Sequence, residues 1–362
     1  MSLPTAISSA LQTIQATQGA MFDSPQGPPL SFGNDEVALA AVTDGAVLVD
    51  RSHWGILEMT GADRLRFLHN QTTNAFTQRQ PGQGCDTVFV TSTARTLDLA
   101  TVYLTAASLW IVTSPGQGQP LLDWMDRYIF PADKVTLTNH TGQIGLFSLI
   151  GPGSQALVQS LGVDLAMDSP YGQHGPLEAT GWRVAVGSGL GWPGYTLFGP
   201  MATAAEVWQH CSQGGAIPAG EALWERWRIQ QGRPVPGAEL TEDINPLEAG
   251  LWHPLSFDKG CYIGQETIAR LNTYRGVKQQ LWGLRLSQGV KPGEPLYLGE
   301  AKVGWVTSVV ETELGILGLG YVRTKAGGKG LTVTVGEARA EVVEVPFLSR
   351  GYLAEVMPPS NV

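Results

Sequence analysis

The C-terminal part of the chain consists of short apolar runs separated by glycine-containing turns, and this pattern constrains the fold most. Six runs of strand length follow residue 279, over Leu281–Leu286, Leu296–Leu298, Val303–Val310, Ile316–Arg323, Leu331–Val335 and Ala338–Val345. Short apolar runs bounded by glycine are typical of strands rather than helices. The pattern therefore predicts a small all-β domain that closes as a barrel.

The residues before 279 show both helical spacing and strand-like runs of apolar residues. Helical spacing of apolar residues predicts helices over residues 3–20, Pro120–Ile129, Met201–Ser212, Glu221–Gln231 and Gln265–Tyr274. Between them lie strand-like runs, such as Val47–Asp50, Leu97–Leu104 and Ile144–Ile150. Such a mixture predicts an α+β, multidomain protein with mixed sheets and helices.

The length of 362 residues favours two or three domains. We predict a first region over residues 1–275, made of two intertwined α+β subdomains that divide near residues 145–155. The change to continuous β character then predicts a barrel domain over residues 276–362.

Composition limits the classes of function. A net charge of -9 argues against direct nucleic-acid binding. The three cysteines, Cys85, Cys211 and Cys261, are far apart, which is typical of a reducing compartment, and no Cys or His spacing suggests a metal site. The sequence has neither a secretory signal nor an apolar stretch of the roughly 20 residues that span a bilayer. We therefore predict a cytoplasmic protein without a membrane partner.

One short stretch, Lys259–Glu266, contains several candidate reactive residues. A cysteine reacts as its thiolate, which nearby cations and helix N-termini stabilise. Lys259 precedes Cys261 by two residues, and a helix is expected from Gln265. The stretch predicts that Cys261 lies at a strand-to-helix corner near amide donors, where Gly260 and Gly264 let the backbone turn. The alternative is a buried structural cysteine in an ordinary loop.

The same eight residues resemble the signature of the YgfZ family, folate-binding relatives of the glycine cleavage aminomethyltransferase (the T-protein). The segment from Val47 to Phe76, with its runs DRSHWGILEMTG and LHNQTTNAF, resembles the entrance of the T-protein fold. The resemblance implies a T-protein-like fold around a central opening that holds tetrahydrofolate. It also implies a role in assembling or maintaining iron–sulfur enzymes, with an effect on tRNA modification through such enzymes.

The resemblance also implies particular folate contacts. Arg228, in ERWRIQQG, matches a family arginine that contacts folate, and a guanidinium suits the glutamate tail. The alternative is an arginine paired with Glu221, Glu225 or another acid. Tyr195 and Thr196 are expected at the cofactor. Trp252 is a further candidate for the cavity, with a place in the core as its alternative.

Two departures from T-proteins weaken the expectation of aminomethyl transfer. The position of the family glutamate that holds the pterin is Thr196, and a hydroxyl supplies no negative charge. The family also uses an aspartate for the transfer. Here Asp98 matches only the first of two acids, and the second position is Leu99.

Cys261, Lys259 and Asp98 are therefore the candidate catalytic residues. Tyr262 packs either on the pterin or in the core, and Gln265 and Glu266 either cap the following helix or bind the ligand. Three functions remain open: a folate-binding accessory protein of iron–sulfur enzymes, a tetrahydrofolate-dependent aminomethyltransferase that works with a lipoyl carrier, and a non-catalytic folate sensor or scaffold. The expected partners are the folate and iron–sulfur enzymes or their assembly proteins.

Overall fold

The computed structural model describes residues 5–25, 27–178, 180–313 and 315–356. The chain forms two compact units. The first contains residues 1–65, 78–85 and 101–225, and the second contains residues 66–77, 86–100 and 226–362. No helix within these described ranges is long and apolar enough to cross a membrane.

The first unit is built on a six-stranded sheet with the order β10-β11-β12-β9-β3-β13. In that order the strands are His174–Leu177, Trp182–Val186, Gly194–Pro200, Ile144–Ile150, Val47–Asp50 and Ile217–Ala219. All four residues of β3 are buried, because β3 pairs with β9 on one side and with β13 on the other. The β3–β13 pair is parallel, and the other pairs are antiparallel.

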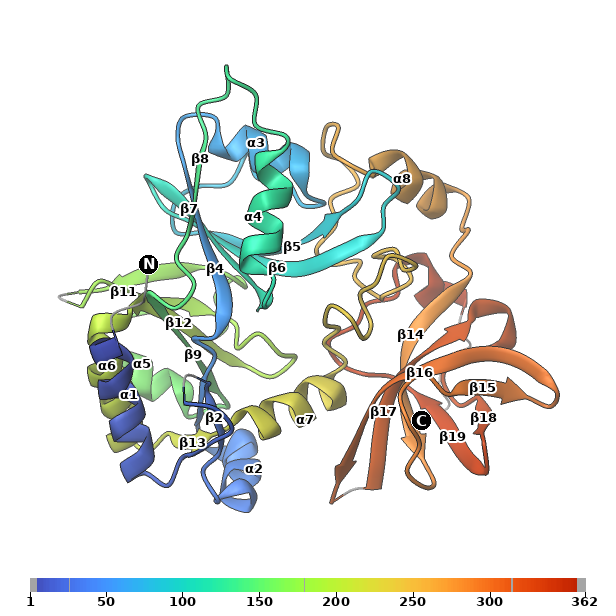
Figure 1. The fold of residues 1–362 in the computed structure, drawn as a ribbon. Helices are drawn as coiled ribbons and strands as arrows, with labels where there is room; N and C mark the ends of the chain where they lie inside the picture. The colour runs from blue at the N-terminus through green and yellow to red at the C-terminus, as the bar shows by residue number, and fades with distance from the viewer. Residues whose placement is uncertain (1–4, 26, 179, 314, 357–362) are drawn as a thin grey trace. The chain divides into compact units, whose positions relative to one another are not determined.

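Helices pack on this sheet around a core that contains Trp182, Trp208 and Phe147. They are α1 (Thr5–Thr17), α5 (Ser154–Ser160) and α6 (Ala204–Gln213), and Figure 1 shows α1 beside α6. Of the apolar stripe expected on the first helix, Leu11 is buried and Ile14 packs against the core, whereas Leu3 lies outside the described residues.

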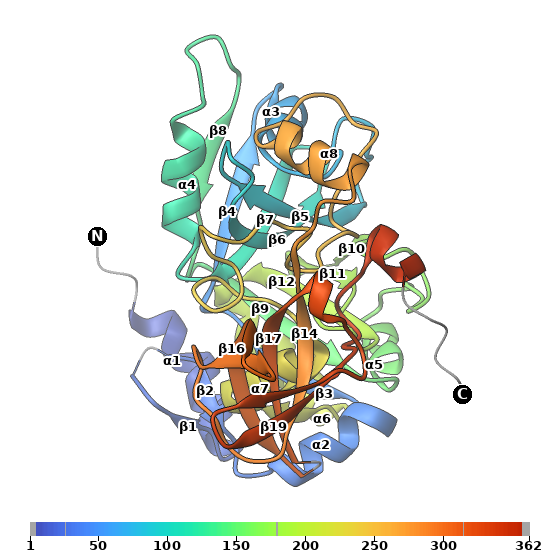
Figure 2. The same ribbon diagram turned by 90° about the vertical axis from the view of Figure 1, so that its right-hand side faces the viewer.

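A second sheet has the order β5-β6-β7-β4-β8. In that order its strands are Gly84–Val90, Thr96–Leu104, Ser108–Pro115, Trp54–Thr60 and Thr136–Asn139. Helix α4 (Gly118–Asp126) contacts β4, β7 and β8, as both views show (Figure 1, Figure 2). The remaining elements before residue 220 are β1 (Met21–Phe22), β2 (Pro29–Ser31), α2 (Asp35–Asp44), α3 (Arg64–Gln71) and a 3-10 turn over Met201–Thr203.

The second unit contains a closed barrel with the strand order β14-β17-β16-β15-β18-β19 (Figure 1). In chain order the strands are Gln279–Leu286, Pro295–Leu298, Ala301–Thr312, Gly315–Arg323, Thr332–Val335 and Ala338–Val343. The prediction of a small all-β barrel is confirmed. The predicted boundary between residues 275 and 276 remains a prediction, three residues before β14 begins.

Two helices carry residues of the candidate site described below. Helix α7 (Glu221–Gln231) has the predicted bounds, and α8 (Gln265–Thr273) ends one residue early. The expected helix over Met201–Ser212 starts instead as a 3-10 turn. The expected strand before Cys261 is absent, since residues 257–263 form an irregular loop.

Candidate functional site

Cys261 is an exposed thiol in the loop that leads into α8. The other two cysteines, Cys85 and Cys211, are buried. Burial raises the pKa of the Cys211 thiol to about 12, so that it stays protonated near neutral pH. Of the three cysteines, Cys261 alone therefore offers an accessible thiol to reagents or partners, and it lies in the signature stretch.

Lys259 fixes this loop to the last turn of α3 and to the segment that follows it. Its ammonium donates hydrogen bonds to three backbone carbonyls, those of His69, of Thr72 (2.7 Å) and of Asn74 (2.6 Å). Nζ also lies 4.6 Å from the ring centroid of Tyr262. An ammonium has three N–H donors, so the three carbonyls use all of them. The expected role of Lys259 beside the thiolate remains a prediction, and the observed contacts of the ammonium are with backbone oxygen atoms and the Tyr262 ring.

The other signature residues shape the loop. Tyr262 is buried in the core of the second unit, which is the alternative expected for it, and burial raises the pKa of its hydroxyl to about 12. Gln265 donates to the carbonyl of Lys259 at 3.4 Å, and Glu266 is an exposed carboxylate in the first turn of α8, where it suits the helix dipole. The loop has a defined conformation because both ends are tied to neighbouring backbone.

Gly264 precedes α8 in the left-handed region, with φ of +80°. A Cβ at this position would lie 2.7 Å from the carbonyl oxygen of Thr91. Gly264→Ala is therefore expected to lower the free energy of unfolding by about 2 kcal/mol, from left-handed strain and the close contact. Urea unfolding checks this, with Gly276→Ala as the control, because a Cβ there would have no neighbour closer than 3.4 Å. Equal losses in the two variants would contradict the expectation.

Arg228 lies in α7 and is buried in an ion pair. Its Nη1 is 2.9 Å from Glu239 Oε2, and its Nη2 donates to Ser308 Oγ at 2.9 Å. Ser308 Oγ in turn donates to Glu239 Oε1 at 2.6 Å. This geometry favours the alternative of an arginine paired with another acid, although the acid is neither Glu221 nor Glu225. A folate carboxylate would have to compete with Glu239, so the role of Arg228 in folate binding remains a prediction.

The other expected folate contacts are also buried. In the first unit, Tyr195 donates its hydroxyl to Leu165 O at 2.7 Å, and Thr196 donates to Gly187 O at 2.7 Å. In the second unit, Trp252 packs edge-on against Tyr352, and Asp98 is fully buried and accepts the Leu99 N–H at 2.8 Å. These four residues are not brought together by contacts within one unit.

The sequence interpretation missed a polar cluster in the first unit, centred on Arg51. The Arg51 guanidinium contacts two indole rings, 4.7 Å from the centroid of Trp54 and 4.6 Å from that of Trp224, and the two rings pack edge-on against each other at 5.7 Å. Its Nη2 donates to Thr196 Oγ1 at 3.3 Å. A cation held against aromatic rings is stabilised by the ring quadrupoles. Arg51 and Trp54 are close in sequence, but Trp224 is remote, so only the fold reveals the group.

Two ionisable side chains of the same unit have strongly shifted pKa values. Burial, with the nearby Glu225 carboxylate, raises the pKa of Glu221 to about 8. Burial, with the Arg51 charge, lowers the pKa of His53 to about 4. Glu221 Oε2 and His53 Nε2 are 3.7 Å apart, beyond hydrogen-bond range. Among the described residues, neither Glu221 Oε2 nor His53 Nδ1, both buried, has a hydrogen-bond partner.

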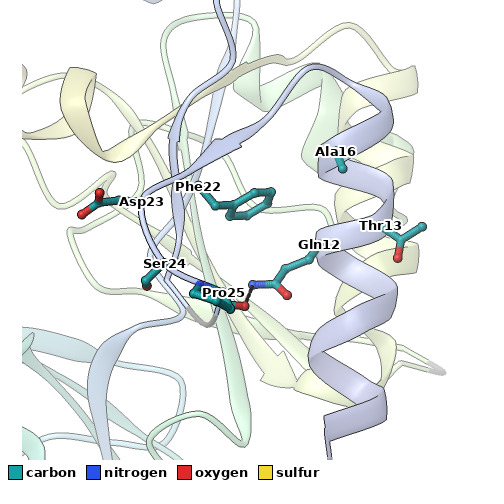
Figure 3. A pocket seen from close by; sticks show the side chains of 7 residues that line it. All are labelled: Gln12, Thr13, Ala16, Phe22, Asp23, Ser24 and Pro25. Atoms are coloured by element: carbon teal, nitrogen blue, oxygen red, sulfur yellow. Dashed lines mark hydrogen bonds between the residues drawn. The ribbon is translucent and has the colours of Figure 1, made fainter.

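A surface depression in the first unit is a poorer candidate. Figure 3 shows it between α1 and the segment Phe22–Pro25, with the Phe22 ring pointing toward the helix. The Gln12 amide donates to Pro25 O at 3.1 Å, and Asp23 is the one ionisable residue of the lining. Across the described part of the chain, no group of three or more His, Cys, Asp or Glu side chains could hold a metal ion.

Comparisons with known proteins agree on one family. Residues 28–259 match the profile of the GCVT N-terminal domain. A chloroplastic protein of Arabidopsis thaliana, whose name proposes it as a transferase, is 43% identical over 355 residues, which cover 97% of this chain and 81% of that protein. An aminomethyltransferase of Halalkalibacterium halodurans is 27% identical over 346 residues, with coverage of 89% and 92%.

The fold of the chain is similar to that of a solved aminomethyltransferase. The crystal structure of glycine cleavage system aminomethyltransferase T from Bartonella henselae superposes with a TM-score of 0.82. The match covers 94% of this chain and 98% of that one, at 20% sequence identity. The expected T-protein-like fold is confirmed.

Proposed function

Because the chain belongs to the GCVT N-terminal domain family, we propose that it is a folate-binding accessory protein of the YgfZ type, which supports the assembly or repair of iron–sulfur enzymes. The observation that carries this proposal is the exposed thiol of Cys261 in a loop anchored by Lys259. An accessible sulfur is a ligand for iron and a nucleophile, and aminomethyl transfer as the T-protein resemblance describes it needs no such group.

In this proposal Cys261 contacts iron or sulfur of a cluster that a partner protein carries. One exposed thiol does not hold a stable cluster alone, since clusters are usually held by four protein ligands. The partner is therefore an iron–sulfur enzyme or an assembly protein, and the effect on tRNA modification is indirect. We propose a cytoplasmic or organellar location, the latter because one relative is chloroplastic.

Tetrahydrofolate is the proposed ligand, and we propose the cluster around Arg51, which contacts Thr196, as the pterin site. A pterin needs flat apolar faces and hydrogen-bond partners. Trp54 and Trp224 supply indole rings, while Glu221 Oε2 and His53 Nδ1 are buried polar atoms without a hydrogen-bond partner among the described residues. We propose that these four residues hold the pterin, which would satisfy the two polar atoms.

The first alternative is a tetrahydrofolate-dependent aminomethyltransferase. The names of several relatives favour it. Against it, the position expected for the pterin-holding acid is Thr196, whose hydroxyl contacts the Arg51 cation. Asp98 is fully buried, and its Oδ1 accepts the N–H of the adjacent Leu99. The second alternative is a folate sensor in which Cys261 is inert.

We expect Cys261→Ser to separate these functions. The variant should bind tetrahydrofolate within about twofold of the wild-type Kd, followed by tryptophan fluorescence. In cells that lack the protein, it should restore no more iron–sulfur enzyme activity than an empty vector, because serine replaces a soft thiolate ligand by a hydroxyl. Cys211→Ala is the matched control, since it removes a buried thiol and should restore activity fully.

Each contrary result points to one alternative. Full restoration by Cys261→Ser would leave the folate sensor. Methylene-tetrahydrofolate production with a lipoyl carrier protein would establish the aminomethyltransferase. Absence of saturable binding at about millimolar tetrahydrofolate would remove folate from the function.

A further inference from the structure

The loop that carries Cys261 lies against a histidine that the sequence interpretation did not assign to it. His69 belongs to the last turn of α3 and is buried, with 9% of its surface exposed. Its backbone carbonyl accepts a hydrogen bond from Lys259 Nζ, and the next residue, Asn70, accepts the Ile263 N–H at 3.0 Å. The two segments are therefore held together on both sides of Cys261.

The imidazole faces the loop at Gly260, the residue before Cys261. A Cβ built on Gly260 would have a single described neighbour within 4 Å, His69 Nε2 at 4.0 Å. Because residue 260 has no side chain, a small gap remains between this nitrogen and the backbone next to Cys261.

The hydrogen bonds of His69 assign its tautomer. The Phe76 backbone N–H donates to Nδ1 at 3.2 Å, so Nδ1 is an acceptor and the proton of the neutral ring is on Nε2. Burial and the Lys259 charge lower the pKa of His69, which favours the neutral ring. Nε2–H has no hydrogen-bond acceptor among the described residues. It is a donor nitrogen that faces the loop, and in this tautomer it has no lone pair for a metal ion.

We propose that His69 Nε2–H is the hydrogen-bond donor of the Cys261 site, where it stabilises the thiolate and an acceptor atom of a group bound to the sulfur. Lys259 cannot fill this role, because its three donors are bonded to carbonyl oxygens. The site thus pairs the Cys261 sulfur with a neutral donor and suits an electrophile that bears a carbonyl or another acceptor. The inference rests on Cys261 being the reactive centre in the proposed function.

Alkylation by iodoacetamide tests, on the full-length protein, whether His69 acts as a donor to Cys261. The thiolate attacks the methylene carbon, a C–S bond forms, and the C–I bond breaks as iodide leaves with the electron pair. Cys85 and Cys211 are buried, so the native protein should gain one adduct, and Cys261→Ser should gain none. We expect the rate at pH 7 to fall about tenfold in His69→Leu, which lacks a donor.

A conservative variant separates a donor from a packing role. His69→Gln keeps an N–H donor and should react within about threefold of the wild type. His210→Leu, which removes a histidine of the first unit, is the control and should leave the rate unchanged. A rate for His69→Leu within about twofold of the wild type would overturn the proposal, as would equal losses in the Leu and Gln variants at unchanged Tm.

A second measurement uses the wild-type protein and does not depend on whether a variant folds. The ¹⁵N resonance of His69 Nε2 should shift when Cys261 is alkylated, while the nitrogens of His140 and His210 should not. An unchanged Nε2 resonance would overturn the proposal even if His69→Leu does not fold. These outcomes are independent of the proposed function, since tetrahydrofolate binding and restoration of iron–sulfur enzyme activity by Cys261→Ser are measured separately.

Discussion

Replacing Lys259 by Met is expected to lower the free energy of unfolding by about 3–5 kcal/mol. The substitution removes the donor from three backbone carbonyls, and each buried carbonyl without a partner costs about 1–3 kcal/mol. Part of this cost is offset, because the ammonium no longer has to be desolvated. Urea unfolding followed by tryptophan fluorescence measures the change.

The control for this prediction is Lys329→Met, which removes an exposed lysine of the same unit and should change stability by less than about 0.5 kcal/mol. A loss below about 1 kcal/mol in Lys259→Met would mean that water replaces the ammonium at the carbonyls. In that case Lys259 would be available for a different role, including the expected one beside the thiolate.

Glu221→Gln is expected to remove much of the pH dependence of stability above pH 5. The pKa of Glu221 is raised from 4.5 to about 8 in the folded protein. Between these values the unfolded chain loses the proton and the folded protein keeps it, so stability falls as pH rises, by up to about 1.4 kcal/mol per unit. The contribution is fully present below pH 4.5 and lost above pH 8. A neutral amide shows no such change.

Urea unfolding at pH 5, 6.5 and 8 tests this prediction. We expect Glu221→Gln to gain about 3 kcal/mol relative to the wild type between the lowest and highest pH, with Glu36→Gln, an exposed acid of the first unit, as the control. Parallel curves for the wild type and Glu221→Gln would contradict it. His53 acts in the opposite sense, because its lowered pKa makes stability fall as pH drops from 6.5 toward 4.

Local sequence patterns predicted the regular elements well. Each of the six barrel strands overlaps its expected run, because glycine-bounded apolar segments determine where a strand begins and ends. The bounds of α7 were predicted without error. The strand expected before Cys261 was wrong, since the loop there is held by hydrogen bonds from Lys259, Ser256 and Ile263 to residues 69–74. No local pattern shows such partners.

The same limit applies to the site. The sequence identified Cys261 and the signature stretch around it, because those residues are contiguous. It did not show that Arg228 pairs with Glu239, that Arg51 contacts both Trp54 and Trp224, or that His69 faces Gly260. Each of these arrangements depends on hydrogen bonds or ring contacts between residues of different elements. These residues are of common types, so they can be recognised as groups only when the fold brings them together.

The contact between Lys259 and the segment after α3 also sets an order of events during synthesis. The ammonium and the His69 carbonyl are 190 residues apart in the chain. At about 5–20 residues per second, a ribosome needs on the order of 10–40 s to cover that interval. Throughout this time the carbonyls of residues 69–74 have no lysine donor, and the second unit cannot close. The hydrogen bonds from Lys259 to this segment therefore form only after translation has passed the signature stretch.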